Sequence, residues 1–250
     1  MKRLIVGNWK LYVPSLKEGQ KLIRAIDKSF PRNIKSTVVV CPPVALAVAL
    51  RASYRGRRIV FGTQDTSIEL EGSNTGEVSP RQLKESGIEY VIVGHMERRA
   101  KGDTDEIVAK KAAAALSVKL QPIICVGEPK RDQEGHFFEY LRKNITDSLA
   151  RVSSSDAKKI VIAYDPLWAI GNAEAPAPSV IREAALFIRK TVSELWGREH
   201  ADKVRIIYGG SVDGENADLI AEGAGVNGIL PGRASVDPEA FCKIIKAFRT

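Results

Sequence analysis

Three ionisable side chains of different types, Lys10, His95 and Asp165, each stand within a few residues of the end of a short apolar run. A carboxylate can accept a proton, an imidazole can polarise a carbonyl or carry a proton, and an ammonium can hold an oxyanion or a phosphate. In a barrel of parallel strands, the chemistry takes place where strand ends meet the loops that follow. The three side chains are therefore candidates for one catalytic set.

Asp165 begins a segment with the features of a lid. Pro166 prevents the strand from continuing, Trp168 and Ile170 give the loop an apolar underside, and Gly171 gives it freedom to move. We expect Asp165 to be a catalytic acid or base beside this lid. An aspartate that only caps a turn is the commoner interpretation of such a segment taken alone.

His95 is one of three histidines and lies between a glycine and a dense cluster of charges. A lone histidine is usually structural or exposed, and a lone lysine such as Lys10 is usually a solvated surface residue. Their position at strand ends, in line with the aspartate, favours a functional role for both. Within the cluster, we expect Glu97 to pair with a cation, and Arg98 and Arg99 to form structural ion pairs.

Two turns that contain glycine follow the last two apolar runs. They read Tyr208-Gly-Gly-Ser-Val212 and Leu230-Pro-Gly-Arg-Ala-Ser235. Glycines expose backbone N–H groups, and the start of a short helix adds its dipole, so the two turns together predict an anion site. The loops after the last two strands are the usual phosphate-binding corner of a (β/α)8 barrel.

The elements that position these groups repeat along the chain. Short runs rich in Val, Ile and Leu are typical of strands buried on both faces of a parallel sheet, and apolar spacings of three and four are typical of helices. Ser79-Pro80 and Asp237-Pro238 predict two further helix starts. The eight apolar runs are Leu4–Val6, Thr37–Cys41, Ile59–Phe61, Tyr90–Val93, Leu120–Val126, Ile160–Tyr164, Val204–Tyr208 and Val226–Leu230, and the clearest helical stretches are Leu16–Ile26, Ile107–Leu116, Phe137–Val152 and Ile181–Leu195.

Strand and helix thus alternate eight times, without a composition break, a linker or a low-complexity tract. This alternation predicts an α/β protein with one domain over residues 1–250, a closed barrel ringed by helices. Pattern alone also allows an open doubly wound sheet.

Composition and charge narrow the class of protein. The net charge of +8 could suit a nucleic-acid binder, but Lys and Arg are spread over the whole chain, so we expect no nucleic-acid partner. A positive field also helps an enzyme to attract a small phosphorylated anion. No window approaches a membrane span, so we expect no membrane contact and an unprocessed chain. Cys41, Cys125 and Cys242 lack metal-like spacing, which favours free thiols, a reducing cytoplasm and no metal.

A series of motifs along the whole chain resembles the triosephosphate isomerase family. The resemblance implies a (β/α)8 TIM barrel and a cytoplasmic enzyme without a cofactor. It also implies interconversion of dihydroxyacetone phosphate and D-glyceraldehyde 3-phosphate through an enediolate. The motifs are Asn8-Trp9-Lys10, Gly76-Glu77-Val78-Ser79, Val93-Gly94-His95, Glu97-Arg98-Arg99, Ala163-Tyr164, Pro166, Trp168-Ala169-Ile170-Gly171 and Tyr208-Gly209-Gly210-Ser211-Val212.

The resemblance implies catalytic roles for individual residues. The family's lysine, which neutralises substrate charge, falls on Lys10, and its neutral histidine, which polarises the carbonyl, falls on His95. The carboxylate base that moves the proton falls on Asp165. The family's active-site asparagine falls on Asn8, and the glutamate that supports the catalytic groups falls on Glu97.

The resemblance also implies how the substrate and a partner are held. The backbone amides that hold the phosphate in the family fall on Gly171, Ser211 and Gly232. The long third loop, from Gln64 to Thr75, reaches into the neighbouring subunit in the family, which implies a homodimer.

Two departures from the family pattern concern the base. Asp165 replaces a glutamate and is one methylene shorter, and a misplacement of about 1 Å can slow a reaction on the order of a hundredfold. Met96 replaces a serine, which removes a hydroxyl group that could hold the carboxylate and adds apolar bulk. The two changes could compensate for each other.

Two more departures concern the lid and the phosphate corner. The lid, residues 171–176, has lost the family's sequence and has Pro176, which we expect to stiffen its second hinge. Pro231 and Arg233 replace a valine and a glycine. Arg233 could supply charge to the phosphate, but we expect its guanidinium to turn toward solvent, because burying another cation adds a desolvation cost.

Two alternatives to a triosephosphate isomerase stay open. The shorter base and the changed phosphate corner suit an aldose-ketose isomerase for another small sugar phosphate. A catalytically weak paralogue could bind a sugar phosphate as a sensor. Retention of Lys10, His95 and an acid argues against the sensor, because a pure binder needs no proton acceptor.

Overall fold

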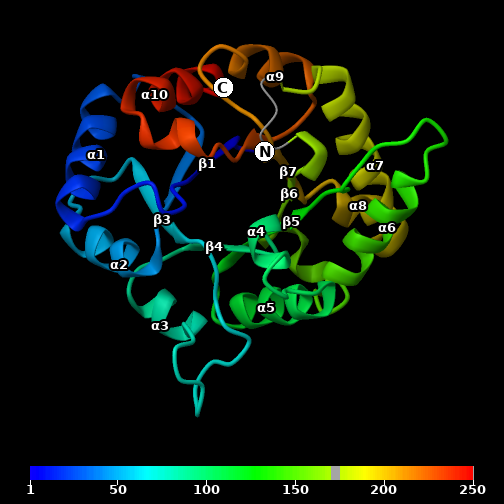
Figure 1. Ribbon diagram of the computed structural model, residues 1–250, viewed down its shortest axis with the longest axis horizontal. Coiled ribbons are helices and arrows are strands. Elements are labelled where there is room, and N and C mark those ends of the chain that lie inside the picture. Colours follow the sequence, from blue (N-terminus) through cyan, green and yellow to red (C-terminus); the bar gives the residue numbers. More distant parts are fainter. Residues whose placement is uncertain (170–174, 250) are drawn as a thin grey trace.

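The computed structural model describes residues 1–169 and 175–249, within which eight parallel strands close into a barrel in their order along the chain (Figure 1). Each strand pairs with the next, and the first pairs with the last, so the closed barrel is confirmed over the open sheet. The strands are β1 (Leu4–Asn8), β2 (Thr37–Cys41), β3 (Ile59–Thr63), β4 (Tyr90–Val93), β5 (Gln121–Val126), β6 (Val161–Tyr164), β7 (Arg205–Tyr208) and β8 (Gly228–Ile229).

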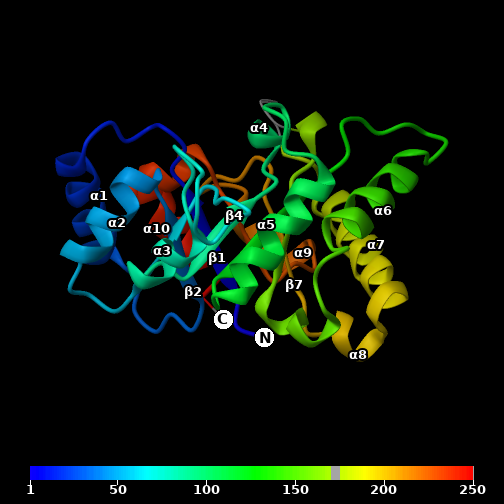
Figure 2. The ribbon, with the colours of Figure 1, turned by 90° about the horizontal axis from the view of Figure 1, so that it is seen from below.

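Helices surround the barrel in this part of the chain (Figure 1). They are α1 (Leu16–Ser29), α2 (Val44–Ser53), α3 (Pro80–Glu85), α4 (Met96–Arg99), α5 (Asp105–Ser117), α6 (Phe137–Ser148), α7 (Pro178–Trp196), α8 (Arg198–Ala201), α9 (Ala217–Gly223) and α10 (Pro238–Ala247), with 3-10 turns η1 (Ser154–Lys159), η2 (Leu167–Ala169) and η3 (Arg233–Val236). The short α4 lies at the end of the barrel opposite the chain termini (Figure 2). Within residues 1–169 and 175–249, none of the helices has the length and apolar character needed to cross a membrane.

The two helix starts expected from a capping residue and a proline are confirmed. The Ser79 hydroxyl accepts the N–H of Arg81 at the start of α3. The Asp237 carboxylate accepts the N–H groups of Glu239 and Ala240 at the start of α10. These bonds satisfy N–H groups that have no partner inside the helix.

The strands are buried on both faces, as their apolar runs predict. Because successive side chains point to opposite faces of a strand, each strand contributes to two layers. In β1, Leu4 and Val6 pack in one cluster with Ile92 of β4, whereas Ile5 packs in a second cluster with Ile26 of α1. The first cluster fills the barrel, and the second joins the barrel to its helices.

Two elements are shorter than the sequence predicts by more than one residue. The helix expected to reach Val152 ends at Ser148, because the chain tightens into a turn in which the N–H of Val152 donates to the carbonyl of Leu149. The last strand begins only after Asn227. The side chain of Asn227 accepts the N–H of Ile206, which takes that group out of the strand ladder.

The three cysteines are free thiols, as expected. Cys41 of β2 and Cys125 of β5 are buried in the cluster that fills the barrel. Burial raises the pKa of both thiols well above the usual range. Cys242 on α10 is only partly buried, and burial also raises its pKa.

Candidate active site

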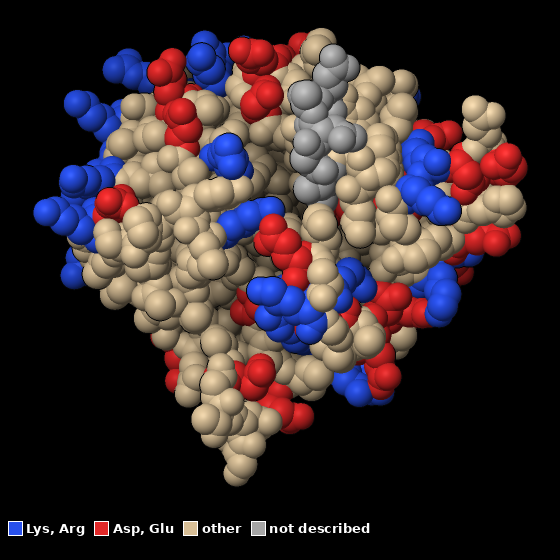
Figure 3. All heavy atoms as spheres, viewed as in Figure 1, with Lys and Arg blue, Asp and Glu red and all other residues tan. Residues whose placement is uncertain are grey.

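A pocket of about 480 Å³ opens at the end of the barrel where the strands finish. Figure 3 shows this hollow near the centre of the barrel end. The pocket brings together the three ionisable residues expected there, Lys10, His95 and Asp165. Its other lining residues are Asn8, Tyr12, Gly209, Gly210, Ser211, Val212, Leu230, Gly232, Arg233 and Ala234.

Lys10, just after β1, has a left-handed backbone with φ of 44°, which residues other than glycine rarely adopt. Its N–H donates to Oδ1 of Asn8 at 3.2 Å. Nε2 of Gln64 donates both to the carbonyl of Lys10 at 3.0 Å and to that of Cys41 at 2.9 Å. These contacts hold an unfavourable backbone in place, and the ammonium group then lies 2.7 Å from Oε1 of Glu97.

His95 is held by the start of α4. Its Nδ1 accepts the N–H of Glu97 at 3.3 Å, so in the neutral ring Nε2 carries the proton. Burial, and secondly the charge of Lys10, lower the pKa of His95 to about 4, against a smaller opposing effect of Glu97. At neutral pH the histidine is therefore an uncharged hydrogen-bond donor.

The conformation before His95 depends on Gly94. This residue has φ of 68°, and a Cβ there would lie 2.7 Å from a methyl group of Val108. The tight turn therefore needs glycine, and it aims His95 into the pocket.

Asp165 directly follows β6, and its N–H donates to the carbonyl of Val126 at 2.8 Å. Its side chain is buried, and neither carboxylate oxygen accepts a hydrogen bond from a described residue. Burial raises its pKa from 3.8 to about 7, with Lys10 lowering it and Glu97 raising it by smaller amounts. Oδ2 lies 3.6 Å from Nε2 of His95. A carboxyl group with this pKa can accept and return a proton near neutral pH.

In the cluster after His95, Glu97 pairs with a cation of the pocket, and Arg98 and Arg99 form structural ion pairs, as expected. Glu97 pairs with Lys10, and although burial alone would raise the pKa of Glu97, the lysine outweighs it and the pKa is lowered. Arg98 pairs with Asp65 at 2.8 Å. Arg99 pairs with an aspartate of α5 at 2.5 Å and donates to the carbonyl of Gly94 at 2.7 Å.

Met96 lies beside the base. It lines a small void that also borders Asp165, Leu167 and Cys125. Met96, which replaces the serine of the family pattern, therefore borders the same void as Asp165 and brings no hydroxyl group to it.

The two glycine turns after β7 and β8 meet on one wall of the pocket. Ser211 and Gly232 line it, and a Cβ on Gly232 would lie 3.7 Å from Cε of Lys10. A Cβ on Gly210 would lie 2.2 Å from the Tyr208 hydroxyl oxygen, so a larger residue there would have to displace this buried ring. Backbone N–H groups beside a lysine suit an anion.

Two expected features of the lid fall outside the described residues: Gly171 and Ile170. Before them, Nε1 of Trp168 donates to Oε1 of Glu128 at 2.8 Å. Glu128 is fully buried and also accepts the Tyr164 hydroxyl at 2.7 Å. Sequence reasoning missed Glu128, although it comes two residues after the fifth apolar run, close to the position that Asp165 has directly after the sixth.

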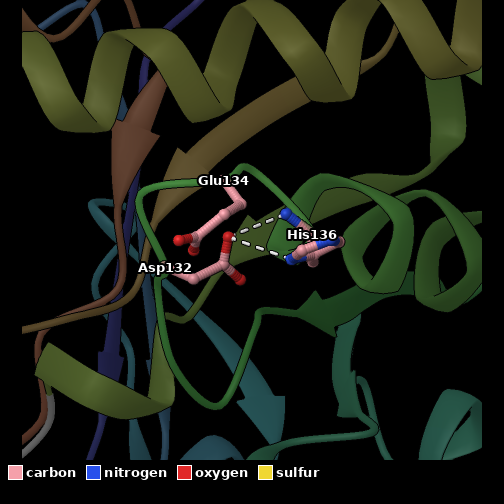
Figure 4. Close-up of side chains that lie close together, drawn as sticks. All are labelled: Asp132, Glu134 and His136. Carbon is pink, nitrogen blue, oxygen red and sulfur yellow. Dashed lines mark hydrogen bonds and ion pairs between the residues drawn. The ribbon is translucent and has the colours of Figure 1, made fainter.

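One other group of potential ligands lies apart from the pocket lining. Asp132, Glu134 and His136, in the loop before α6, bring one ligand atom each within 4.8 Å of one another (Figure 4). Glu134 and His136 are exposed. Asp132 is already used by the loop, because its Oδ1 accepts the N–H of His136 at 2.8 Å. We assign no metal to this group.

Comparison with known proteins agrees with this geometry. A family model described as Triosephosphate isomerase matches residues 3–248. Proteins named Triosephosphate isomerase from Thermoanaerobacter sp. (strain X514) and Carboxydothermus hydrogenoformans are 41% and 40% identical to the chain, over 97% and 98% of its length and 98% of theirs. The protein of that name from Aquifex aeolicus is 38% identical over 99% of this chain and 100% of its own. The chain therefore belongs to the triosephosphate isomerase family.

Proposed function

We propose that this chain interconverts dihydroxyacetone phosphate and D-glyceraldehyde 3-phosphate, with Asp165 as the proton acceptor where the family has glutamate. The family consists of aldose-ketose isomerases. One observation carries the assignment to these residues: a neutral histidine and a carboxyl group with a pKa of about 7 lie 3.6 Å apart in a pocket that also holds a lysine.

The proposed reaction assigns one role to each group. Nε2–H of His95 donates a hydrogen bond to the substrate carbonyl, and Lys10 offsets the negative charge of the substrate and of the enediolate. Asp165 takes a proton from the carbon next to the carbonyl and returns it to the neighbouring carbon, with His95 exchanging protons between the two oxygens. Asn8 and Glu97 hold Lys10 in position. No cofactor is needed for this proton transfer.

We assign the phosphate to the wall formed by the last two glycine turns. The N–H groups of Ser211 and Gly232 would contact it, together with that of Gly171. Arg233 follows Gly232 and lies at the rim. Met96 shapes the apolar side of the base.

A coupled isomerase assay on both triose phosphates tests the proposal, with a four-carbon sugar phosphate measured beside them. We expect the highest kcat/KM for the triose phosphates. Asp165→Asn should remove turnover and retain phosphate binding, because the amide keeps the shape but accepts no proton. A higher kcat/KM for the four-carbon substrate would contradict the proposed specificity. An active Asp165→Asn enzyme would contradict the base.

We also infer a homodimer that uses the loop from Gln64 to Thr75. This loop lies in the segment that projects from the barrel between β3 and α3 (Figure 1), and Leu11 beside the pocket is 85% exposed. A leucine exposed to this extent beside the proposed catalytic lysine supports a second chain that covers it. Light scattering should give twice the chain mass, and Thr75→Arg should lower it. A monomer at micromolar concentration would contradict the inference.

We further infer that the protein works in a reducing compartment such as the cytoplasm. Its buried cysteines, Cys41 and Cys125, are free, and disulfides are the rule for cysteine pairs in oxidising compartments. Fractionation of the source cells would test this.

A further inference from the structure

We propose that Arg233, positioned by Tyr12, selects substrates that carry a phosphate dianion. This inference rests on the proposed function, because it assigns a specificity element to the same pocket. Both side chains line the pocket, at its phosphate wall and its rim. Their roles differ, because Arg233 contributes charge and Tyr12 fixes where that charge stands.

The backbone before Arg233 is firmly anchored. The N–H of Ser235 donates to the carbonyl of Gly232 at 2.9 Å, and the Ser235 hydroxyl donates to the same oxygen at 2.6 Å. Ser235 is fully buried. The N–H of Asn8 donates to the carbonyl of Pro231 at 2.9 Å, which ties this turn to the strand that leads to Tyr12.

Tyr12 holds the guanidinium from the other side. The central carbon of the Arg233 guanidinium lies 5.5 Å from the centre of the Tyr12 ring, within the range of a cation–π contact. The N–H of Tyr12 donates to the carbonyl of Trp9 at 3.1 Å, and Trp9 is fully buried. An otherwise flexible side chain is thereby directed along the pocket rim.

The charges around the pocket make Arg233 available to a ligand. The ammonium of Lys10 lies 2.7 Å from Glu97, so this one cation is shared between a carboxylate and the substrate. Among residues 1–169 and 175–249, Arg233 has no ion pair with a carboxylate. Arg233 is also exposed, so the desolvation cost that opposes a buried cation does not arise at the rim. A phosphate dianion at Gly232 would therefore gain a second cation.

Steady-state kinetics at pH 8, where inorganic phosphate is mainly a dianion, tests this arrangement. Arg233→Gln keeps most of the stem and removes the charge. We expect it to raise KM for D-glyceraldehyde 3-phosphate and Ki for inorganic phosphate about fivefold to tenfold, with kcat within about twofold. The kcat/KM for unphosphorylated glyceraldehyde should not change. Arg57→Gln, an exposed charge removed before β3 at the other end of the barrel, is the matched control.

Tyr12 variants test the positioning role. Tyr12→Leu removes the ring and should raise Ki for phosphate about threefold, whereas Tyr12→Phe keeps the ring and should retain the parent's Ki. Arg233→Gln combined with Tyr12→Leu should bind phosphate as weakly as Arg233→Gln alone, because the ring acts through the guanidinium. Additive effects would overturn the positioning role.

Equal phosphate affinity in Arg233→Gln and the parent would overturn the whole inference. Phosphate binding measured directly by phosphorus NMR keeps this test separate from the proposed function. If the parent did not isomerise triose phosphates, a weaker phosphate complex in Arg233→Gln would still support the rim cation. A fully active parent with unchanged phosphate binding in Arg233→Gln would refute only the proposed role of Arg233 and would leave the proposed function standing.

Discussion

Replacing Asp165 by asparagine should stabilise the fold near neutral pH while it removes the proton acceptor. Burial raises the pKa of Asp165 from 3.8 to about 7, whereas the unfolded chain releases this proton from about pH 4 upward. Between these values the unfolded state binds fewer protons than the folded state, so the parent's free energy of unfolding falls as the pH rises. A shift of about three units corresponds to roughly 4 kcal/mol, of which roughly 1.5 kcal/mol is lost by pH 5 and the rest by about pH 7.

Urea unfolding at pH 5 and pH 8, at one protein concentration, measures this effect. Asp165→Asn does not titrate, so its advantage over the parent should grow by roughly 2 to 3 kcal/mol between the two pH values. The pKa of His95 is about 4, and the loss of a nearby carboxylate does not raise it, so the histidine is neutral in both folded proteins and its titration cancels in the comparison. Asp218→Asn, an exposed change on α9, should show no such growth. A stability difference that does not vary with pH would contradict the prediction that burial of the ionised Asp165 carboxylate destabilises the fold.

Three further predictions concern activity. The kcat/KM of the parent should rise with pH and level off above about pH 7, because Asp165 must be ionised to accept a proton; a profile that is flat from pH 5 to pH 8 would exclude it as the base. Lys10→Met should weaken binding of phosphoglycolate, an enediolate mimic, at least tenfold in an inhibition assay, and unchanged inhibition would place Lys10 outside the site. Asp165→Glu should raise kcat, because the carboxylate oxygens of Asp165 have almost no exposed surface and one more methylene extends them toward the substrate; a lower kcat would show that Met96 has adapted the site to aspartate.

The sequence predicts the barrel and the meeting of its catalytic groups for one physical reason. Strands buried on both faces need continuous apolar runs, and a parallel barrel places the residues after those runs at one end. Lys10, His95 and Asp165 follow three different runs and line one pocket. The residues that follow the apolar runs therefore indicate the site, just as the runs indicate the strands.

The supports of these groups could not be predicted in the same manner. Gln64 holds the carbonyl of Lys10 from 54 residues away, and Glu128 accepts the hydroxyl of Tyr164 from 36 residues away. Such contacts depend on the rotation of each side chain about a strand end, which residue spacing does not encode. The pKa of Asp165 likewise depends on how deeply the finished barrel buries it.

The two thiols inside the barrel can serve as reporters of its opening. Alkylating reagents attack a thiolate, and burial both raises the pKa of Cys41 and Cys125 and excludes the reagent. Cys242, on an outer helix and partly buried, will be labelled first and shows that the reagent is active. Labelling of Cys41 and Cys125 then measures how often β2 and β5 leave the barrel in native buffer. The labelling rates of Cys41 and Cys125 therefore report local opening at two separate strands of the unmodified enzyme.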